Sequence, residues 1–425
     1  MAPIRIIPSS NRAAVARVFA RRSERLEEAE RAVLPILNAV RREGDQALVR
    51  FARKWDGFEG TRAAQLRVSR EEILAGANQV SPQFRRAVRQ AGRNIRAFCR
   101  LQMPREWRKS IGSGIRAGQL VRPLDSVGCY IPAGRYPLPS TLLMTAIPAQ
   151  VAGVPRIVVC TPRPVPETLA AAAELGVEEI YTVGGAQAIG ALAYGTESIA
   201  PVQKIVGPGN AYVAAAKRIV SRDTGIDFVA GPTEVLIIAD KGNPSWIAAD
   251  LLAQAEHDTD ATAILLTTSK ALAERVARAV AAQLVALPEG SPAAVALKNN
   301  GAIVIVRSRE EAIELANRFA PEHLCVPADL PLSRIQNAGS VFVGPYSPEA
   351  AGDYASGPNH VLPTSGRARQ RGGLSVADFV KVISVQQLQP AGLQRIAAAI
   401  VTLARGEGLE AHARSVEIRL NSNRA

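Results

Sequence analysis

The few histidines of this chain stand where a small polar site could form. The sequence holds 4 histidines in 425 residues, and they are His257, His323, His360 and His412. Each lies among polar residues, Gly or Pro rather than on an apolar stripe. Taken alone, a histidine in such a place is more often structural than a ligand. Because none is left over elsewhere, the sequence favours one shared site, where imidazoles would bind a metal ion or transfer protons.

The spacing of Gln254 and His257 suits two ligands of one metal ion. They lie three residues apart near the end of a predicted helix that starts close to Pro244, so their side chains share one face. Asp353 and His360 bracket the loop GDYASGPNH, whose Gly and Pro allow the chain to fold around a small site. A ligand set of oxygen and nitrogen without cysteine suits zinc, with manganese or another divalent cation as alternatives.

Glu322 and His323 are neighbours in the segment APEHL. On a loop, adjacent residues can direct a carboxylate and an imidazole into the same small volume. This pairing is common in general acid–base chemistry. A solvated Glu–His pair is the default reading of these two residues alone, so that alternative stays open at this point.

Glycine-rich turns follow two of the predicted strands. Gly184-Gly185 comes after the strand 180–183, and Gly207-Pro208-Gly209-Asn210 comes after the strand 204–206. Both turns open predicted helices, so backbone N–H groups at the helix start could bind a phosphate or another anion. The GxGxxG fingerprint of dinucleotide-binding proteins is absent, because GSGIRAG at 112–118 has the wrong spacing. The residues alone indicate a metal-dependent α/β enzyme and leave nucleotide binding open.

From Val127 onward, short apolar runs alternate with Ala-rich segments. Such alternation predicts parallel sheets covered by helices on both faces. The first 125 residues and those after about 375 have a helical pattern instead, with Ser81-Pro82 opening a helix. We expect strands at 157–160, 180–183, 204–206, 235–239, 264–267, 303–306 and 341–343, and helices at 140–152, 166–175, 186–194, 210–221, 244–256, 270–285 and 309–319.

The formal net charge of +13 raises the question of nucleic-acid binding. The excess lies within residues 1–125, which hold 26 basic and 12 acidic residues. There the basic residues alternate with acidic ones at helical spacing, as in RRSERLEEAERAV, and no zinc-finger spacing or RNP-type aromatic motif is present. A nucleic-acid-associated or purely structural protein would also leave the four scarce histidines unexplained. We therefore expect a solvated helical surface and no nucleic-acid partner.

Apolar runs such as 157–160 are far shorter than the ~18 residues that a membrane-spanning helix needs. The first 22 residues lack the apolar core and cleavage site of a signal peptide. The cysteines form no CxxC pair or dense framework. These features predict a cytoplasmic protein with no membrane partner.

Long segments of the chain are recognisable. In order they are GDQALVRFARKWDG, GCYIPAGRYPLPSTLLMTAIPAQVAGV, GGAQAIGALAYGT, KIVGPGNAYVAAAKR, GPTEVLIIAD, LLAQAEHD, APEHL, GDYASGPNHVLPT and GLEAH. The chain resembles the histidinol dehydrogenase family across nearly its whole length. Chance similarity is negligible with so many segments in one order.

The resemblance implies an activity and an architecture. Members oxidise L-histidinol to L-histidine through an aldehyde, in two hydride transfers that consume two NAD and one water. The implied fold is α/β, with two incomplete Rossmann-like domains, one inserted in the other, in an intertwined homodimer whose C-terminal tail completes the partner's site. We expect an N-terminal arm at 1–22, a first domain at 23–126 and 235–375, a second at 127–234 and a helical tail at 376–425.

The resemblance also implies which residues bind the cofactors. Carried over by motif, Tyr130 in CYIPAG, Gln187 in GGAQAIG and Asn210 in GPGNAY contact NAD. One zinc ion per subunit is bound by four ligands, of which the last comes from the other subunit. These ligands are Gln254, His257, Asp353 and His412.

The same resemblance assigns the catalytic roles. His323 is the general base for the substrate hydroxyl, and Glu322 activates the water that attacks the aldehyde. Glu407 recognises the imidazole or amine end of histidinol, and His360 lines the pocket. The implied substrate contacts are Thr233, Gln254, His257, His323, Asp353, Glu407 and His412.

One residue departs from the family pattern. The segment that usually reads GP-S-E-V has Thr233 in place of the serine, so the hydroxyl is kept and a methyl group is added. A related branch of similar proteins oxidises sulfopropanediol with the same zinc and NAD. Glu407 favours a cationic or imidazole-bearing substrate over a sulfonate, because a carboxylate repels an anion.

Overall fold

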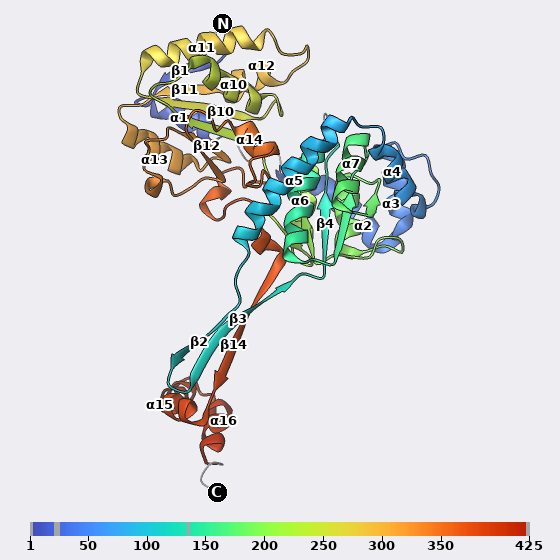
Figure 1. Cartoon of the computed structure of the whole chain (residues 1–425), viewed down its shortest axis with the longest axis vertical. Coiled ribbons are helices and arrows are strands. Elements are labelled where there is room, and N and C mark those ends of the chain that lie inside the picture. Colours follow the sequence, from blue (N-terminus) through green and yellow to red (C-terminus); the bar gives the residue numbers. More distant parts are fainter. Residues whose placement is uncertain (1–2, 21–25, 134–136, 422–425) are drawn as a thin grey trace.

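The computed structural model describes residues 3–20, 26–133 and 137–421. Figure 1 shows two α/β bodies and a slender arm that projects away from them. Each body is built on a parallel sheet, and the arm is built on a three-stranded antiparallel sheet. The predicted fold class, α/β with parallel sheets and with helices near both termini, is confirmed.

The first body contains a six-stranded sheet in the order β1-β11-β10-β9-β12-β13. Segments such as TAILLT are buried along their whole length, which is typical of parallel strands covered on both faces. Helices α10 (Pro244–Ala255), α11 (Lys270–Leu284) and α12 (Ala293–Asn300) pack on one face, and α1 (Arg12–Ala20) and α13 (Arg309–Phe319) pack on the other. The strands are β1 (Arg5–Pro8), β9 (Glu234–Ile238), β10 (Thr262–Thr267), β11 (Ala302–Ile305), β12 (His323–Val326) and β13 (Ser340–Val343).

The second body contains a five-stranded sheet in the order β6-β5-β4-β7-β8. Helix α6 is buried on nearly every side. Among the described residues, no helix is both long and apolar enough to cross a membrane. The strands are β4 (Ser126–Tyr130), β5 (Arg156–Cys160), β6 (Glu179–Tyr181), β7 (Lys204–Val206) and β8 (Gly225–Ile226). One face carries α4 (Arg70–Ala77), α5 (Pro82–Gln102), α6 (Pro139–Ala152) and α7 (Pro166–Leu175), and the other carries α2 (Leu26–Glu43), α3 (Asp45–Phe51), α8 (Gly185–Tyr194) and α9 (Ala211–Val220).

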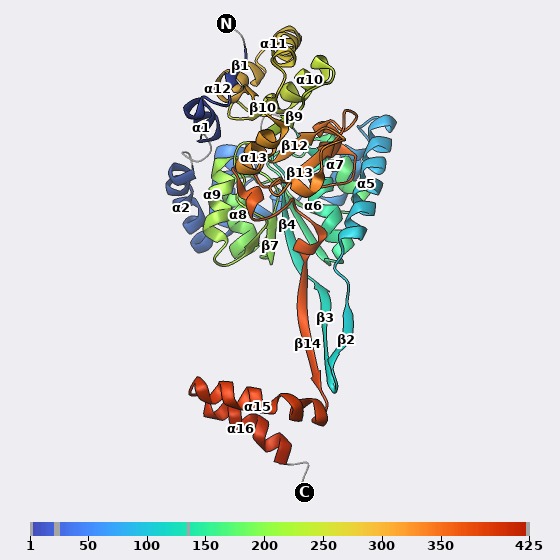
Figure 2. The same cartoon turned by 90° about the vertical axis from the view of Figure 1, so that its left-hand side faces the viewer.

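The arm joins two segments that are far apart in the sequence. Strands β2 (Trp107–Gly112) and β3 (Ile115–Pro123) form a hairpin, and β14 (Val380–Leu388) pairs with β3 along its whole length. Helices α15 (Pro390–Gly406) and α16 (Glu410–Asn421) pack together at the far end, as Figures 1 and 2 show. The remaining helical segments are η1 (Ala52–Asp56), η2 (Ala63–Leu66), η3 (Leu332–Arg334), α14 (Glu349–Tyr354), η4 (Arg367–Arg369) and η5 (Val376–Phe379).

The division of the chain differs from the one expected from the sequence. One body is inserted in the other, as predicted, because β1 and β9–β13 enclose the second body in the sequence. However, the helices of 26–102 pack on the five-stranded sheet, not on the sheet of 234–343, and β1 of the expected N-terminal arm pairs with β11. An amphipathic pattern shows that a helix buries one face, but it does not show which sheet that face covers.

Each strand and helix predicted between 140 and 343 is found within two residues of its expected bounds. The helical interpretation of the first 125 residues is wrong at Arg5–Pro8, which is β1, and at 107–123, where β2 and β3 lie. The expected helical tail begins with the short 3-10 helix η5 and continues as strand β14 before its first α-helix. The loop expected at Glu322-His323 is also shorter than predicted, because His323 is the first residue of β12. In β2, β3 and β14 the side chains are polar or half-exposed, so the apolar pattern that would predict a strand is weak.

Candidate functional site

The predicted site residues outside the C-terminal tail lie near one edge of each parallel sheet. Glu234 opens β9 and His323 opens β12, and His323 pairs with Val235 in register, so both lie at the amino edge of the first sheet. Tyr130 ends β4 and Gly207 follows β7, so they lie at the carboxyl edge of the second sheet. The two groups are therefore positioned by different bodies of the molecule.

Residues 353–365 connect the two edges. His360 lies with Nδ1 2.8 Å from the backbone oxygen of Asp353 and Nε2 3.3 Å from the hydroxyl of Thr141, near the start of α6. Five residues on, the backbone N–H of Ser365 donates to Oε1 of Glu234 at 3.1 Å. His360 thus holds the first body against the second, and its side chain is engaged on both nitrogens.

A buried relay of hydrogen bonds links α10 to β12. Gln254 donates from Nε2 to the hydroxyl oxygen of Thr233, and Thr233 donates in turn to Oε2 of Glu322 at 2.5 Å. The backbone N–H of Glu234 donates to the same carboxylate oxygen at 2.8 Å. The relay fixes Glu322 in one orientation and connects it to Gln254.

His323 is buried beside this relay. Its Nδ1 lies 3.2 Å from the backbone oxygen of Glu234, and its Nε2 lies 3.5 Å from Oδ1 of Asp353. The ring is 3% exposed and packs on Phe342 with centroids 5.7 Å apart. A proton on Nδ1 donates to the Glu234 carbonyl, so in the neutral ring Nε2 is the basic nitrogen.

The charges of this cluster shift the pKa values of its members. Burial raises the pKa of Glu322, against the opposing effect of His323. Burial alone would lower the pKa of His323, but the charge of Glu322 and the contact with Asp353 raise it to about 10. Burial would raise the pKa of Asp353, but the hydrogen bond and charge of His323 hold it below its usual value. The negative charges of Glu322 and Asp353 therefore increase the proton affinity of the His323 ring, which suits a group that accepts a proton.

Gln254 has an unused ligand atom. Its side chain is fully buried, and its Oε1 has no hydrogen-bond partner. His257, one helical turn further along, has Nδ1 3.0 Å from the backbone oxygen of Ala253, which leaves Nε2 for a ligand. The electrostatic effect of His257 helps to lower the pKa of Asp353. Within this one chain, the described residues form no group of three His, Cys, Asp or Glu side chains that could hold a metal ion.

The predicted residues of the tail do not reach this cluster in the same chain. Glu407 caps the end of α15, and His412 lies in α16. Figures 1 and 2 show both helices at the far end of the arm, away from the two bodies. One chain therefore brings together the site residues of β9, α10, β12 and α14 but not those of α15 and α16.

The residues expected to contact NAD lie around the start of α8 and α9. The hydroxyl of Tyr130 accepts a hydrogen bond from Gly185 N–H at 3.1 Å. The amide nitrogen of Gln187 donates to Oδ2 of Asp56 at 3.0 Å. Asn210 is the N-cap of α9, and its Oδ1 accepts from the backbone N–H of Val213 at 3.1 Å.

Three carboxyl groups near these sites were not predicted, of which Glu349 is buried and Asp56 and Asp250 are half-buried. Asp56 accepts from Gln187 and from the N–H of Gly184, and burial raises its pKa. Glu349 is 1% exposed, neither of its oxygens has a hydrogen-bond partner, and burial raises its pKa well above the usual value. Burial raises the pKa of Asp250 to about 6. Their spacing was a usable signal, because Asp250 and Glu349 each lie one helical turn before a predicted ligand.

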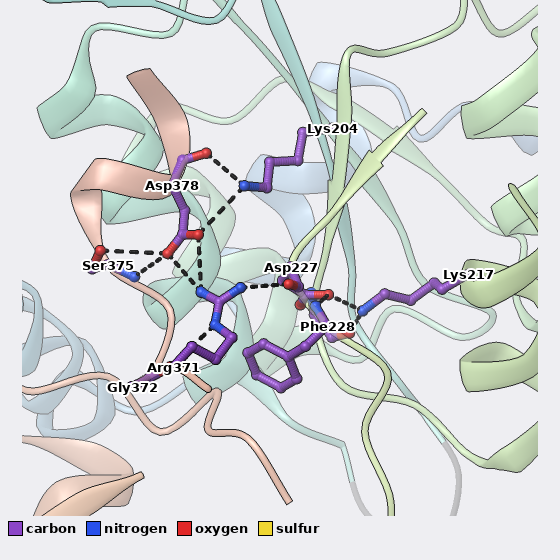
Figure 3. Close-up of polar contacts among 9 residues, drawn as sticks. Lys204, Lys217, Asp227, Phe228, Arg371, Gly372, Ser375 and Asp378 are labelled. Carbon is purple, nitrogen blue, oxygen red and sulfur yellow. Dashed lines mark hydrogen bonds and ion pairs between the residues drawn. The ribbon is translucent and has the colours of Figure 1, made fainter. Parts of the chain in front are cut away.

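A second polar network lies beside β7 and β8 of the second sheet (Figure 3). Lys217 and Asp227 form an ion pair whose side chains are 2% and 0% exposed. Arg371 donates to the backbone oxygen of Asp227 at 2.5 Å and to both carboxylate oxygens of Asp378 at 2.9 and 3.0 Å. Lys204 donates to the backbone oxygen of Asp378 at 2.8 Å. This network ties the base of the arm to β7, β8 and α9.

Comparisons with known proteins agree across the whole chain. A family model described as histidinol dehydrogenase matches residues 19–420. The chain is 50% identical over 399 residues to histidinol dehydrogenase of Gluconobacter oxydans (strain 621H), covering 92% of this chain and 93% of that protein. It is 48% identical over 397 residues to the protein of the same name from Methanothermobacter thermautotrophicus, covering 91% and 92%.

A solved structure gives the same result for the fold. The crystal structure of histidinol dehydrogenase from Elizabethkingia anophelis matches with a TM-score of 0.94 and 39% identity, and the match covers 100% of both chains. The sequence identity, the coverage and the fold agree, so the chain belongs to the histidinol dehydrogenase family.

Proposed function

We propose that this chain oxidises L-histidinol to L-histidine with two NAD and one water, in a zinc-dependent homodimer. The observation that carries the proposal is the buried cluster of Gln254, Thr233, Glu322 and His323, found in a chain of this family. Two oxidations of one carbon need a base for the alcohol and a group that activates water for the aldehyde. The adjacent Glu322 and His323 supply one of each.

The residues fit a zinc ion. The buried Oε1 of Gln254 lacks a hydrogen-bond partner, although buried polar atoms in proteins are usually satisfied. Nε2 of His257 and the carboxylate of Asp353 are the other ligands that this chain offers, and they belong to the nitrogen and oxygen donors that zinc accepts. A fourth ligand is needed to close the site, and we assign it to His412 of the partner subunit.

The two catalytic residues divide the work. When bound, zinc polarises the substrate's oxygen and orients the amino alcohol, and NAD accepts the hydride in each oxidation. His323, oriented by the Glu234 carbonyl, accepts the hydroxyl proton at Nε2 in the first oxidation. Glu322, oriented by Thr233 and the N–H of Glu234, accepts a proton from the water that attacks the aldehyde. The resulting hydrate anion gives up the second hydride, and the carboxylic acid that forms releases its remaining proton to water and becomes the carboxylate.

The NAD assignment rests on the carboxyl edge of the second sheet. Tyr130, Gln187 and Asn210 come from the ends of β4, β6 and β7, where open parallel sheets usually bind their ligands. The starts of α8 and α9 present backbone N–H groups there, which suit a pyrophosphate. In the protein without NAD, Asp56 and the Tyr130 hydroxyl satisfy two of these N–H groups.

The arm supports the proposed homodimer. Apolar side chains are exposed along β2, β14 and the terminal helices, and a monomer would leave them in water. They include Trp107 at 42%, Ile111 at 68%, Val382 at 53%, Leu403 at 67% and Ile418 at 65% exposure. A second copy of the chain is the partner that would cover them and receive Glu407 and His412.

The second candidate substrate is a small alcohol such as sulfopropanediol. The described cluster is rich in carboxyl groups, with Glu322, Glu349 and Asp353 around one histidine. An anionic sulfonate would be repelled there, whereas the amine and imidazole of histidinol are attracted. The geometry therefore favours histidinol.

Thr233 provides a test of the relay. Thr233→Val keeps the shape but removes the hydroxyl, so the buried Gln254 and Glu322 each lose a hydrogen-bond partner. Losing such a partner costs about 1–3 kcal/mol, so we expect kcat/KM to fall ~10–100-fold. Thr233→Ser restores the hydroxyl and is the control, with activity within about threefold of wild type. Equal activity of the valine and serine variants would contradict the role of the hydroxyl.

The direct test is NADH formation by the purified protein with L-histidinol, run beside sulfopropanediol and simple alcohols. We expect two NADH per histidinol, loss of activity on chelation and recovery on adding zinc. Wild-type protein with zinc that forms NADH faster from sulfopropanediol than from histidinol would exclude the proposed substrate. Activity that survives complete removal of bound metal would exclude the zinc.

A further inference from the structure

The turn at Gly207-Pro208-Gly209-Asn210 has no side chain of its own that could hold its first residue in place. Gly207 has φ +117°, in the region that favours glycine, and a Cβ there would lie 2.2 Å from the backbone oxygen of Tyr130. Its backbone therefore packs directly on the end of β4. Both of its backbone polar groups are buried in this contact and need partners from elsewhere.

A buried ion pair satisfies both groups. The carboxylate of Asp227 accepts from Gly207 N–H at 2.8 Å, and the ammonium of Lys217 donates to the carbonyl of the same glycine at 2.9 Å. The two side chains also contact each other, and both lie within 2% of complete burial. Each charge thus meets the backbone group of Gly207 that has the opposite polarity.

Stability alone is a weak reason for this ion pair. Removing two charges from water costs free energy that their attraction only partly returns, and well-packed apolar residues often replace such pairs without loss. The pair does fix a direction, because the ammonium binds only the carbonyl and the carboxylate only the N–H. Asn210, three residues later, is the N-cap of α9. A fixed orientation of Gly207 therefore also limits where Asn210 and the start of α9 can lie.

We infer that Lys217 and Asp227 are positioning residues that hold the 207–210 turn in its NAD-binding conformation before the cofactor arrives. The inference rests on the proposed function, because Asn210 is a cofactor contact only if NAD binds at this edge. Neither residue needs to touch the cofactor. Arg371 supports the ion pair through the backbone oxygen of Asp227, to which it donates a hydrogen bond (Figure 3). Its guanidinium lies 5.0 Å from the ring centre of Phe228.

The test compares two double variants of the full-length protein. Lys217→Met with Asp227→Leu replaces the pair by apolar side chains and leaves Gly207 without either partner. The control is Arg156→Met with Glu179→Leu, which removes an ion pair at the opposite, amino edge of the same sheet. NADH affinity is measured by fluorescence titration, and KM is measured separately for NAD and for histidinol.

We expect the apolar pair at 217 and 227 to weaken NADH binding and raise KM for NAD by about tenfold or more, because two charged hydrogen bonds to the turn are lost. KM for histidinol should change by less than about threefold. The control pair should lower the melting temperature and leave NADH affinity within about threefold of wild type. If Lys217 and Asp227 had a purely structural role, both double variants would change the affinity for NADH by the same factor.

The outcomes separate the inference from the proposed function. Wild-type protein that does not bind NADH would overturn the proposed cofactor and this inference with it. Wild-type protein that binds NADH, together with a folded 217/227 variant that binds it equally well, would overturn only the inference.

Hydrogen exchange of the wild-type protein gives a second measurement that does not depend on a variant folding. The Gly207 amide should exchange slowly without NADH, and adding NADH should change its rate little, because the turn is already held. Fast exchange that slows only when NADH binds would show that the cofactor orders the turn, and the inference would fail.

Discussion

A His412→Ala subunit combined with a His257→Ala subunit is expected to recover up to half of the wild-type activity, although each homodimer alone is inactive. His257 lies just after α10 in the first body, and His412 lies in α16, at the far end of the arm. If each site takes His412 from the partner, one site of the heterodimer has lost both ligands and the other keeps both. Each homodimer loses one ligand at both sites.

The size of the effect follows from the role of the ligands. Loss of an outer-shell partner of a metal site typically costs ~10–100-fold, and loss of a direct ligand costs more. Each homodimer should therefore retain little zinc and little activity. The two chains are purified with different tags, mixed and selected for both tags, and zinc content is measured with the rate. Heterodimers that carry both tags and remain inactive would exclude a site shared between subunits.

Glu322→Gln and His323→Ala should separate the two oxidations. His323→Ala removes the proposed base for the alcohol proton, so oxidation of histidinol should fall by ~10²–10⁴. Part of the rate should return when histidinal is supplied instead. Glu322→Gln should slow histidinal oxidation by a similar ~10²–10⁴ factor, because that step needs activated water.

Glu322→Gln is a clean substitution in this structure. One oxygen of Glu322 accepts from both Thr233 and the N–H of Glu234, and the amide oxygen of glutamine can accept both. The fold should therefore survive, and far-ultraviolet circular dichroism is the control. Rates with histidinol and histidinal are measured by NADH formation. Wild-type oxidation of histidinal by the Glu322→Gln protein would show that another group activates water.

Much of the fold was predictable where the side chains are apolar. The buried strand Thr262–Thr267 and the helix Arg309–Phe319 follow directly from apolar runs and helical spacing. Strand β14 was not predicted, because its side chains are mostly exposed in one chain and its partner β3 lies more than 250 residues earlier. Contacts that depend on distant pairing or on another chain leave little local pattern.

The site was predictable in its residue types but not in its connections. Scarcity and spacing pointed to Gln254, His257 and His323, and the structure shows that Thr233 connects Gln254 to Glu322. The relay could not be predicted from the sequence, since its hydrogen-bond partners come from separate elements. The spacing of Glu349 before Asp353 was a usable signal, but it did not show that the carboxyl group would be buried without a hydrogen-bond partner. The Lys217–Asp227 pair was also missed, because nothing local distinguishes a buried lysine from an exposed one on α9.

The arm has a consequence for how activity depends on the amount of protein. In one chain, α16, which carries His412, lies at the far end of the arm, away from both bodies. If His412 of the partner completes each site, as proposed, catalysis begins only after two chains meet, and at low abundance the reaction rate rises with the square of chain concentration. Dilution below the dissociation constant of the proposed dimer should abolish the enzymatic activity without unfolding the chain. A cell with few copies would thus produce less histidine per copy than a cell with many.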